Sequence, residues 1–235
     1  MPALHWSKVE ILPKADAAEN KLPTGPAGSH YYAARETDAA LFRVTGGKKT
    51  EVEKFLFHRG VGSFTAPLTV QLDSADATRV ALQNTGPEPL RDLYVCHAQD
   101  GQVSWERVES LAPGAQVTVL TNAGGAKKRS REMLAAALRE SLTAAGLFPK
   151  EAAAMVQTWE DSWLGETGLR VLYTLPRAWT DRTLPLTITP APARTERVMM
   201  AEKRAPEFSA YSWELLEKIS APEKPAATAA TPAPL

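Results

Sequence analysis

Short apolar segments separated by turn residues fill the chain between residues 30 and 120. Within them valine, leucine and aromatic residues alternate with polar ones, and glycine, proline, asparagine or aspartate clusters stand between them. This alternation is the period of a strand with one buried face. Eight strands are predicted, at residues 30–36, 41–45, 51–61, 68–72, 79–83, 90–98, 102–109 and 115–120. Their spacing favours an antiparallel sandwich or barrel, with Asp100-Gly101 as the clearest hairpin turn.

The apolar period changes from two to about 3.6 after residue 126. Leu134, Leu138 and Leu142 form one stripe, and Gly146 ends the segment. We therefore expect a helix over residues 127–145.

A second helix is predicted over residues 149–164. Pro149 suits the first helical position, Glu151 the positive end of the helix dipole, and Gly165 a left-handed C-terminal cap. Its apolar stripe consists of Ala152, Met155, Val156, Trp159 and Trp163. Because Trp159 shares this stripe, we predict that it lies in the core, where truncation to alanine costs about 3–5 kcal/mol.

Two further strands are expected after the second helix, at residues 169–173 and 184–188. A turn at residues 179–182 would join them into a hairpin, and residues 197–201 could add a third strand. We expect the tryptophan-bearing helix to pack against this hairpin.

Together these elements predict an α+β fold. It consists of an antiparallel β-sandwich followed by an αα-hairpin and a small β-extension. The predicted organisation is an N-terminal strand and loop (1–29), the sandwich (30–122), the helical hairpin with its β-hairpin (123–204), and a short helix with a tail (205–235).

The C-terminal residues have a different composition. Residues 208–219 could form a short amphipathic helix through Tyr211, Leu215 and Ile219, and alanine, proline and threonine dominate after Ser220. Such a composition cannot offset an ordering entropy of about 1–2 kcal/mol per residue, so we predict a disordered, removable tail. Tails of this kind often link a domain to another domain or to an anchor.

Charge and cysteine content narrow the possible partners. The chain has 27 basic and 27 acidic residues, so nothing favours nucleic acid or an anionic membrane. Cys96 is the only cysteine, which excludes an intramolecular disulfide. No run of 18 apolar residues is present, and no secretory signal is recognisable. We expect a cytoplasmic location as written, or a periplasmic or extracellular one if a signal peptide was trimmed.

One local resemblance concerns residues 79–95 and 108–119. The first run contains Asn84-Thr85-Gly86 before a proline, and the second contains Leu111-Ala112-Pro113-Gly114 before a strand. These features resemble immunoglobulin-like β-sandwich modules of bacterial exported proteins. The resemblance implies an adhesive or accessory role in the cell envelope, and it brings no catalytic residues.

A second resemblance is broader. Residues Tyr31 to Asp38, Lys54 to Gly62 and Leu169 to Thr189 look like a bacterial family with no assigned activity. It adds no functional expectation.

Catalytic motifs are largely missing from the sequence. The four histidines (His5, His30, His58 and His97) have no helical i, i+4 pairing, and there is no nucleophile elbow or phosphate loop. Cys96 lies in an apolar strand, where a buried small hydrophobe is the simplest interpretation. We expect no cofactor and no metal.

Carboxylates near tryptophans provide the one catalytic hypothesis. Glycoside hydrolysis needs two carboxyl groups flanking a bond, and sugars stack on aromatic rings. The candidates are Glu160, Asp161, Glu166 and Asp181, which lie close in sequence to Trp159, Trp163 and Trp179. Exposed acids on an amphipathic helix explain the same pattern without catalysis.

A second polar concentration is a candidate binding patch. It consists of Arg35, Glu36, Asp38, His58 and Arg59. The simpler interpretation is a cross-strand ion pair from Arg59 to Glu36 or Asp38.

Two functional hypotheses follow. The first is a non-catalytic binding or structural module of the cell envelope that contacts a protein partner or a glycan. The alternative is a carboxylate-dependent, glycan-directed hydrolase. Buried indoles favour the module, whereas exposed indoles beside two carboxylates about 5–10 Å apart favour the enzyme.

Overall fold

The computed structural model describes residues 4–12, 22–24, 29–46, 49–58, 60–72, 79–99, 101–121 and 130–205. Its class is α+β, and all paired strands in this part of the chain run antiparallel. The predicted helix at 208–219, the tail after Ser220 and the side chain of Arg59 lie outside the described residues.

Two sheets share one hydrophobic cluster. The first has the order β4-β5-β8 and consists of β4 (Leu68–Leu72), β5 (Arg79–Asn84) and β8 (Gln116–Leu120). The second has the order β10-β9-β6-β7 and consists of β6 (Leu90–Gln99), β7 (Gln102–Leu111), β9 (Gly168–Thr174) and β10 (Met200–Arg204). Leu82 of the first sheet and Leu93 and Val171 of the second are fully buried in this cluster.

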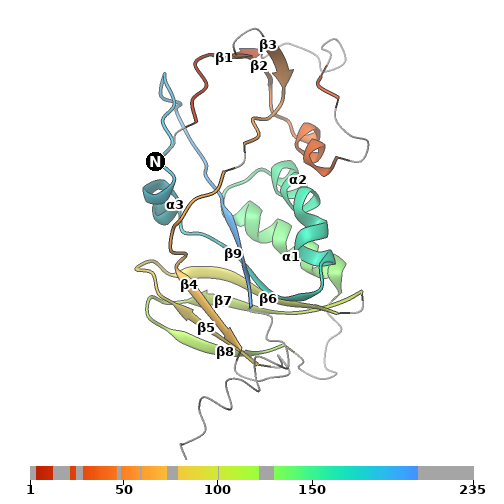
Figure 1. The fold of residues 1–235 in the computed structure, drawn as a ribbon, viewed down its shortest axis with the longest axis vertical. Helices are drawn as coiled ribbons and strands as arrows, with labels where there is room; N and C mark the ends of the chain where they lie inside the picture. The colour runs from red at the N-terminus through yellow and green to blue at the C-terminus, as the bar shows by residue number, and fades with distance from the viewer. Residues whose placement is uncertain are drawn as a thin grey trace, which may run out of the picture.

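Two helices cover the other face of the four-stranded sheet (Figure 1). They are α1 (Arg131–Ala144) and α2 (Pro149–Glu160). Leu134, Leu138 and Leu142 of α1 are buried, which confirms the predicted stripe. Tyr94 of β6 reaches this layer, where its hydroxyl lies 2.6 Å from Ser141 Oγ. The four-stranded sheet is therefore buried on both faces, which explains the nearly continuous apolar run of β9.

Local capping residues set the helix ends. Ser130 Oγ accepts from Met133 N, and Pro149 occupies the first turn of α2, as expected. Glu151 Oε2 accepts from Phe148 N at 2.9 Å. Gly146 adopts φ 121°, a conformation that favours glycine, directly after α1.

The expected left-handed cap at Gly165 is wrong. Instead of ending, α2 widens into the π-helical turn η2 (Asp161–Gly165), and Glu166 N donates to Asp161 O at 3.0 Å. Gly165 lacks a positive φ. This π turn carries Trp163, and such turns are frequent at functional sites.

The turns around β5 follow the predicted chemistry. The side chain of Asn84 is fully buried, its Nδ2 donates to Glu88 O and Leu111 O, and its Oδ1 accepts from Gly86 N, each at 2.9 Å. Gly114 has φ 74°, as a type II turn after Pro113 requires. Gln99 pairs with Gln102, which confirms the predicted hairpin.

Two predicted strand segments in the N-terminal part need correction. Residues 30–36 form the 3₁₀-helix η1 (His30–Glu36), and the strand expected at 51–61 ends at Glu53. Lys54 Nζ binds Arg35 O and Thr37 O, each at 3.0 Å, so the end of η1 is satisfied by a side chain rather than by a sheet.

The predicted β-hairpin at 169–188 is also wrong. β9 forms as expected, but its neighbours are β6 and β10, and the expected turn is the helix α3 (Arg177–Thr183). Residues 184–188 form no strand, and Leu186 and Ile188 are exposed. The backbone of β9 pairs on both sides, with β6 and with β10. Residues 184–188 therefore have no free edge of β9 with which to pair. The third strand expected at 197–201 is found at Met200–Arg204.

A separate three-stranded sheet lies at the opposite end of the molecule (Figure 1). It has the order β1-β2-β3, from β1 (Val9–Leu12), β2 (Leu41–Gly46) and β3 (Lys49–Glu53). Thus β2 and β3 pair with the N-terminal strand and not with β4 to β8.

The buried thiol of Cys96 allows a first test. Cys96 is almost fully buried, and burial raises the pKa of its thiol. We expect 5,5′-dithiobis(2-nitrobenzoate) to label the folded protein at pH 8 on the order of a hundredfold more slowly than the protein in guanidinium chloride. Equal rates measured by absorbance would contradict the burial of Cys96.

Candidate functional site

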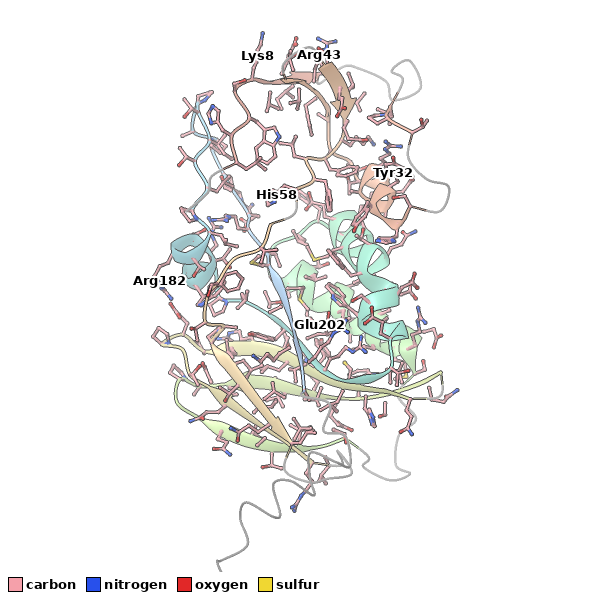
Figure 2. The ribbon with its side chains drawn as sticks, in the orientation of Figure 1. Lys8, Tyr32, Arg43, His58, Arg182 and Glu202 are labelled. Atoms are coloured by element: carbon pink, nitrogen blue, oxygen red, sulfur yellow. The ribbon has the colours of Figure 1, made fainter. Side chains whose placement is uncertain are left out.

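A hollow of about 340 Å³ lies between the helix layer and β10. Figure 2 shows Glu202 on β10, next to the helices. The walls come from the end of α2, from η2 and from the start of β10: Met155, Trp159, Trp163, Val198, Met199, Met200 and Glu202. The lining is therefore almost entirely apolar, with three thioethers and two indoles.

The two indoles of the hollow have different surroundings. Trp163 is buried, but Trp159 is 39% exposed, so the prediction that Trp159 belongs to the core is wrong. Their rings stack at 6.3 Å with an interplanar angle of 18°, and Tyr31 of η1 meets Trp159 only edge-on at 6.5 Å. Trp159 therefore stands at the rim of the hollow, between Trp163 and Tyr31.

An aromatic path continues from the hollow towards the N-terminal sheet. Phe57 contacts Tyr31 at a ring distance of 4.5 Å, and Tyr31 contacts Trp159. Phe57 is itself exposed. The apolar surface around the hollow thus extends over residues that are distant in sequence.

A buried arginine holds the π turn that carries Trp163. Arg170 of β9 is 1% exposed, and its guanidinium donates to the carbonyl oxygens of Ser162 and Glu166. It also donates to Thr167 O at 3.3 Å and lies 3.8 Å from Glu202 Oε1. The sequence analysis missed Arg170. Its signal was a single arginine inside an apolar strand, at the position between Leu169 and Val171.

The only carboxylate of the hollow is already paired. Glu202 Oε1 lies 2.8 Å from Arg204 Nε and 3.8 Å from Arg170, and Ser162 Oγ lies 3.5 Å from its other oxygen. Two guanidinium groups therefore neutralise this carboxylate, and the lining has few polar groups with which to bind a ligand.

None of the four carboxylates proposed for catalysis lines this hollow. Arg131 lies 3.2 Å from Glu160 and 3.8 Å from Asp161, and Arg204 lies 2.5 Å from Glu166.

Asp181 belongs to a different place, on α3. It binds Arg177 at 2.6 Å and Arg197 at 2.7 Å, and these bonds, from Arg177 above all, hold its pKa below its ordinary value. A carboxyl kept ionised in this way is unsuited to donate a proton. Trp179, its aromatic neighbour in sequence, is buried.

A second hollow of about 470 Å³ adjoins α3 and residues 185–197. Its two arginines form hydrogen bonds within the chain: Arg177 donates to Thr195 O at 3.0 Å, and Arg197 donates to Leu184 O at 2.6 Å. Both guanidinium groups thus hold the loop after α3 in place, and nothing in this hollow identifies a ligand.

The candidate binding patch is divided among separate partners. Arg35 pairs with Glu53 at 2.5 Å and stacks over Tyr32, and Asp38 pairs with Lys150 of α2 at 2.5 Å. His58 lies 5.8 Å from the ring of Trp6.

The ion pair expected between Arg59 and Glu36 or Asp38 cannot be followed, since Arg59 lies outside the described residues. Glu36 is exposed. Of the five patch residues, Arg35 joins η1 to β3 and Asp38 joins the segment after η1 to α2.

Within the same part of the chain, no cluster of three or more histidine, cysteine, aspartate or glutamate side chains could hold a metal ion. None of its helices is long and apolar enough to cross a membrane. Comparison with protein-family models, with curated proteins and with solved structures found no match. The argument for function therefore starts from the geometry of the hollow.

Proposed function

We propose that the chain is a non-catalytic binding module that takes an apolar side chain of a protein partner into the hollow between α2, η2 and β10. The observation that carries this proposal is the exposure of Trp159 at a hollow with a methionine-rich wall. Half-exposed tryptophans beside a pocket are typical anchors of protein interfaces. Methionine side chains adapt to different apolar partners because they are flexible and polarisable.

A protein partner fits this lining better than a glycan. Sugar hydroxyls lose water on burial and need hydrogen-bond partners in return. The side chain of Glu202 is the only charged group of the lining, and two arginines already bind it.

The alternative of a glycan-directed hydrolase has less support. Its four candidate carboxylates are bound to arginines and lie outside the lining of the hollow. Asp181 is also held below its ordinary pKa by Arg177 and Arg197, the opposite of what the general acid of this chemistry needs.

We also propose that the two sheets with a shared core are an immunoglobulin-like sandwich that acts in the periplasm or outside the cell. The turns at Asn84 and Pro113-Gly114 support this proposal, because they resemble those of exported bacterial modules. Determining where a tagged full-length protein fractionates in its host tests the compartment.

The test of the binding function uses a phage-displayed library of random twelve-residue peptides. A peptide selected on the parent protein is synthesised with a fluorophore, and its Kd is measured by anisotropy. We expect Trp159→Ala to weaken binding at least about tenfold, since central tryptophans contribute roughly 2 kcal/mol or more. Because the indole is half-exposed, the free energy of unfolding should fall by only about 1 kcal/mol. The Tm should accordingly fall by only a few degrees.

Phe148→Ala is the matched control, since Phe148 is an exposed aromatic residue at the other end of α2. Its affinity should equal that of the parent. If Trp159→Ala binds the peptide as tightly as the parent, or if its Tm collapses, the hollow is not the binding site that we propose.

A further inference from the structure

β10 is an edge strand that borders the hollow. Its sheet has the order β10-β9-β6-β7, so among the described residues β10 has a neighbouring strand on one side only. Each of its five residues is at least partly exposed. An open edge presents unpaired backbone groups that can template another strand.

The hydrogen bonds of β10 show which backbone groups face outward. Met199 O accepts from Leu175 N at 2.8 Å, and Ala205 N donates to Leu169 O at 3.0 Å. In an antiparallel pair the residues whose backbone groups face the partner alternate along the strand. The groups of Met200, Glu202 and Arg204 therefore point away from β9, toward the open edge.

The side chains of β10 alternate between the two faces of its sheet. Met200 packs with the helix-side cluster, whereas Met199 and Ala201 pack with the cluster between the sheets. Both Met200 and Glu202 line the hollow. Directly opposed side chains of neighbouring strands lie about 4.5–5.5 Å apart. A strand added to the edge of β10 would thus direct every second side chain toward the hollow.

The size of the hollow agrees with an inserted side chain. At about 340 Å³ it lies near the lower limit of small-molecule sites, which span roughly 300–1,000 Å³. It has room for one large apolar side chain, while the rest of a bound segment lies along β10.

One carboxylate on η2, which forms part of the wall of the hollow, is available to a basic residue of the partner. Two connected groups of ion pairs flank it: Glu160 and Asp161 with Arg131, and Glu166 and Glu202 with Arg170 and Arg204. Within these ion pairs the four carboxylates exceed the three guanidinium groups by one negative charge, and the exposed Lys203 of β10 adds one positive charge. The Asp161 carboxylate is 96% exposed, so it is the group most available to a cation.

From these observations, and resting on the proposed function, we propose that an extended segment of a partner protein adds to the edge of β10 as a fifth strand. The segment inserts one large apolar side chain between Trp159 and Met200 and carries a lysine or arginine beside Asp161. Main-chain hydrogen bonds to Met200, Glu202 and Arg204 supply affinity, and the hollow supplies specificity.

The test compares Glu202→Pro with Glu202→Ala, using the peptide selected on the parent protein. Both changes remove the carboxylate, but only proline removes the outward backbone donor, and proline is tolerated on the open side of an edge strand. We expect Glu202→Pro to weaken binding at least tenfold relative to Glu202→Ala. Peptides with N-methylated backbone nitrogens at alternate positions form a second series, which does not depend on the folding of a variant. Methylation at positions facing β10 should weaken binding at least tenfold, and methylation at the positions between them should not.

The charge is tested separately with Asp161→Asn. This change should weaken the peptide several-fold at low salt and leave its affinity unchanged at high salt. Equal affinities for the parent and for Asp161→Asn at low salt would contradict the proposal that the partner carries a basic residue beside Asp161.

Failure of this inference and failure of the proposed function give different results. If Trp159→Ala loses the peptide while Glu202→Pro and every methylated peptide bind like their controls, the hollow binds a side chain without strand addition. If Trp159→Ala also binds normally, the proposed function itself is wrong. A dimer seen by sedimentation with the parent but not with Glu202→Pro would assign the edge to a second copy and overturn the proposal.

Discussion

Arg170→Ala is expected to lower the free energy of unfolding by about 3–5 kcal/mol, the range for breaking a buried, hydrogen-bonded charge pair. The guanidinium is buried and donates to the carbonyl oxygens of Ser162 and Glu166. Alanine would leave these acceptors without their donor and would leave Glu202 with one arginine fewer. Since folded domains are stable by about 5–15 kcal/mol, the loss would be a large part of the total.

Urea unfolding monitored by tryptophan fluorescence measures this effect as a lower midpoint at similar slope. Arg204→Ala is the matched control, because Arg204 also pairs with Glu202 but is 54% exposed. Exposed pairs contribute about 0–1 kcal/mol, so this variant should unfold close to the parent. Equal midpoints for both variants would show that Arg170 does not hold the π turn.

Asn84→Ala is expected to lower the free energy of unfolding by about 3 kcal/mol, because it removes the three hydrogen bonds of a fully buried side chain at once. The side chain joins the end of β5 to Leu111, Glu88 and Gly86. Alanine fills none of these roles, and each buried partner left unsatisfied costs about 1–3 kcal/mol. The loss of stability should come without loss of the Trp159 site, which lies on the other face of the four-stranded sheet.

Gln83→Ala provides the control, since Gln83 is exposed and precedes Asn84 on the same strand. Its free energy of unfolding, measured in urea, should remain within about 0.5 kcal/mol of that of the parent. An Asn84→Ala protein as stable as Gln83→Ala would mean that water replaces the lost bonds.

Local signals explain which parts of the fold could be read from the sequence. The stripe at Leu134, Leu138 and Leu142 and the strand at 68–72 appear as predicted, because their apolar period matches one secondary structure only. Asn84 and Gly114 mark real turns for the same reason, since turn chemistry depends on neighbouring residues.

The errors fall where tertiary contacts decide. The run at 30–36 has strand composition but is helical, because it packs on α2 and is capped by Lys54. β9 pairs with β6 and β10 instead of with residues 184–188. Strand preference reflects packing and pairing more than an intrinsic property of the segment, so it cannot select among possible neighbours.

The candidate site shows the same division. The sequence drew attention to Trp159 and Trp163 through their helical spacing, but it placed Trp159 in the core. Met200 and Glu202, which complete the hollow, and Arg170, which holds it, come from strands that no spacing rule connects to the helix.

The sequence by itself determined the α+β class, the helical stripes, the principal turns and the burial of Cys96. The tertiary structure alone decided the strand order, the exposure of Trp159, the pairing of the four candidate catalytic carboxylates with arginine, and the edge position of β10 among the described strands. The physical reason is range. Periodicity, capping and turns are set by neighbours a few residues away, whereas strand partners and side-chain exposure depend on which distant surfaces meet in the folded chain.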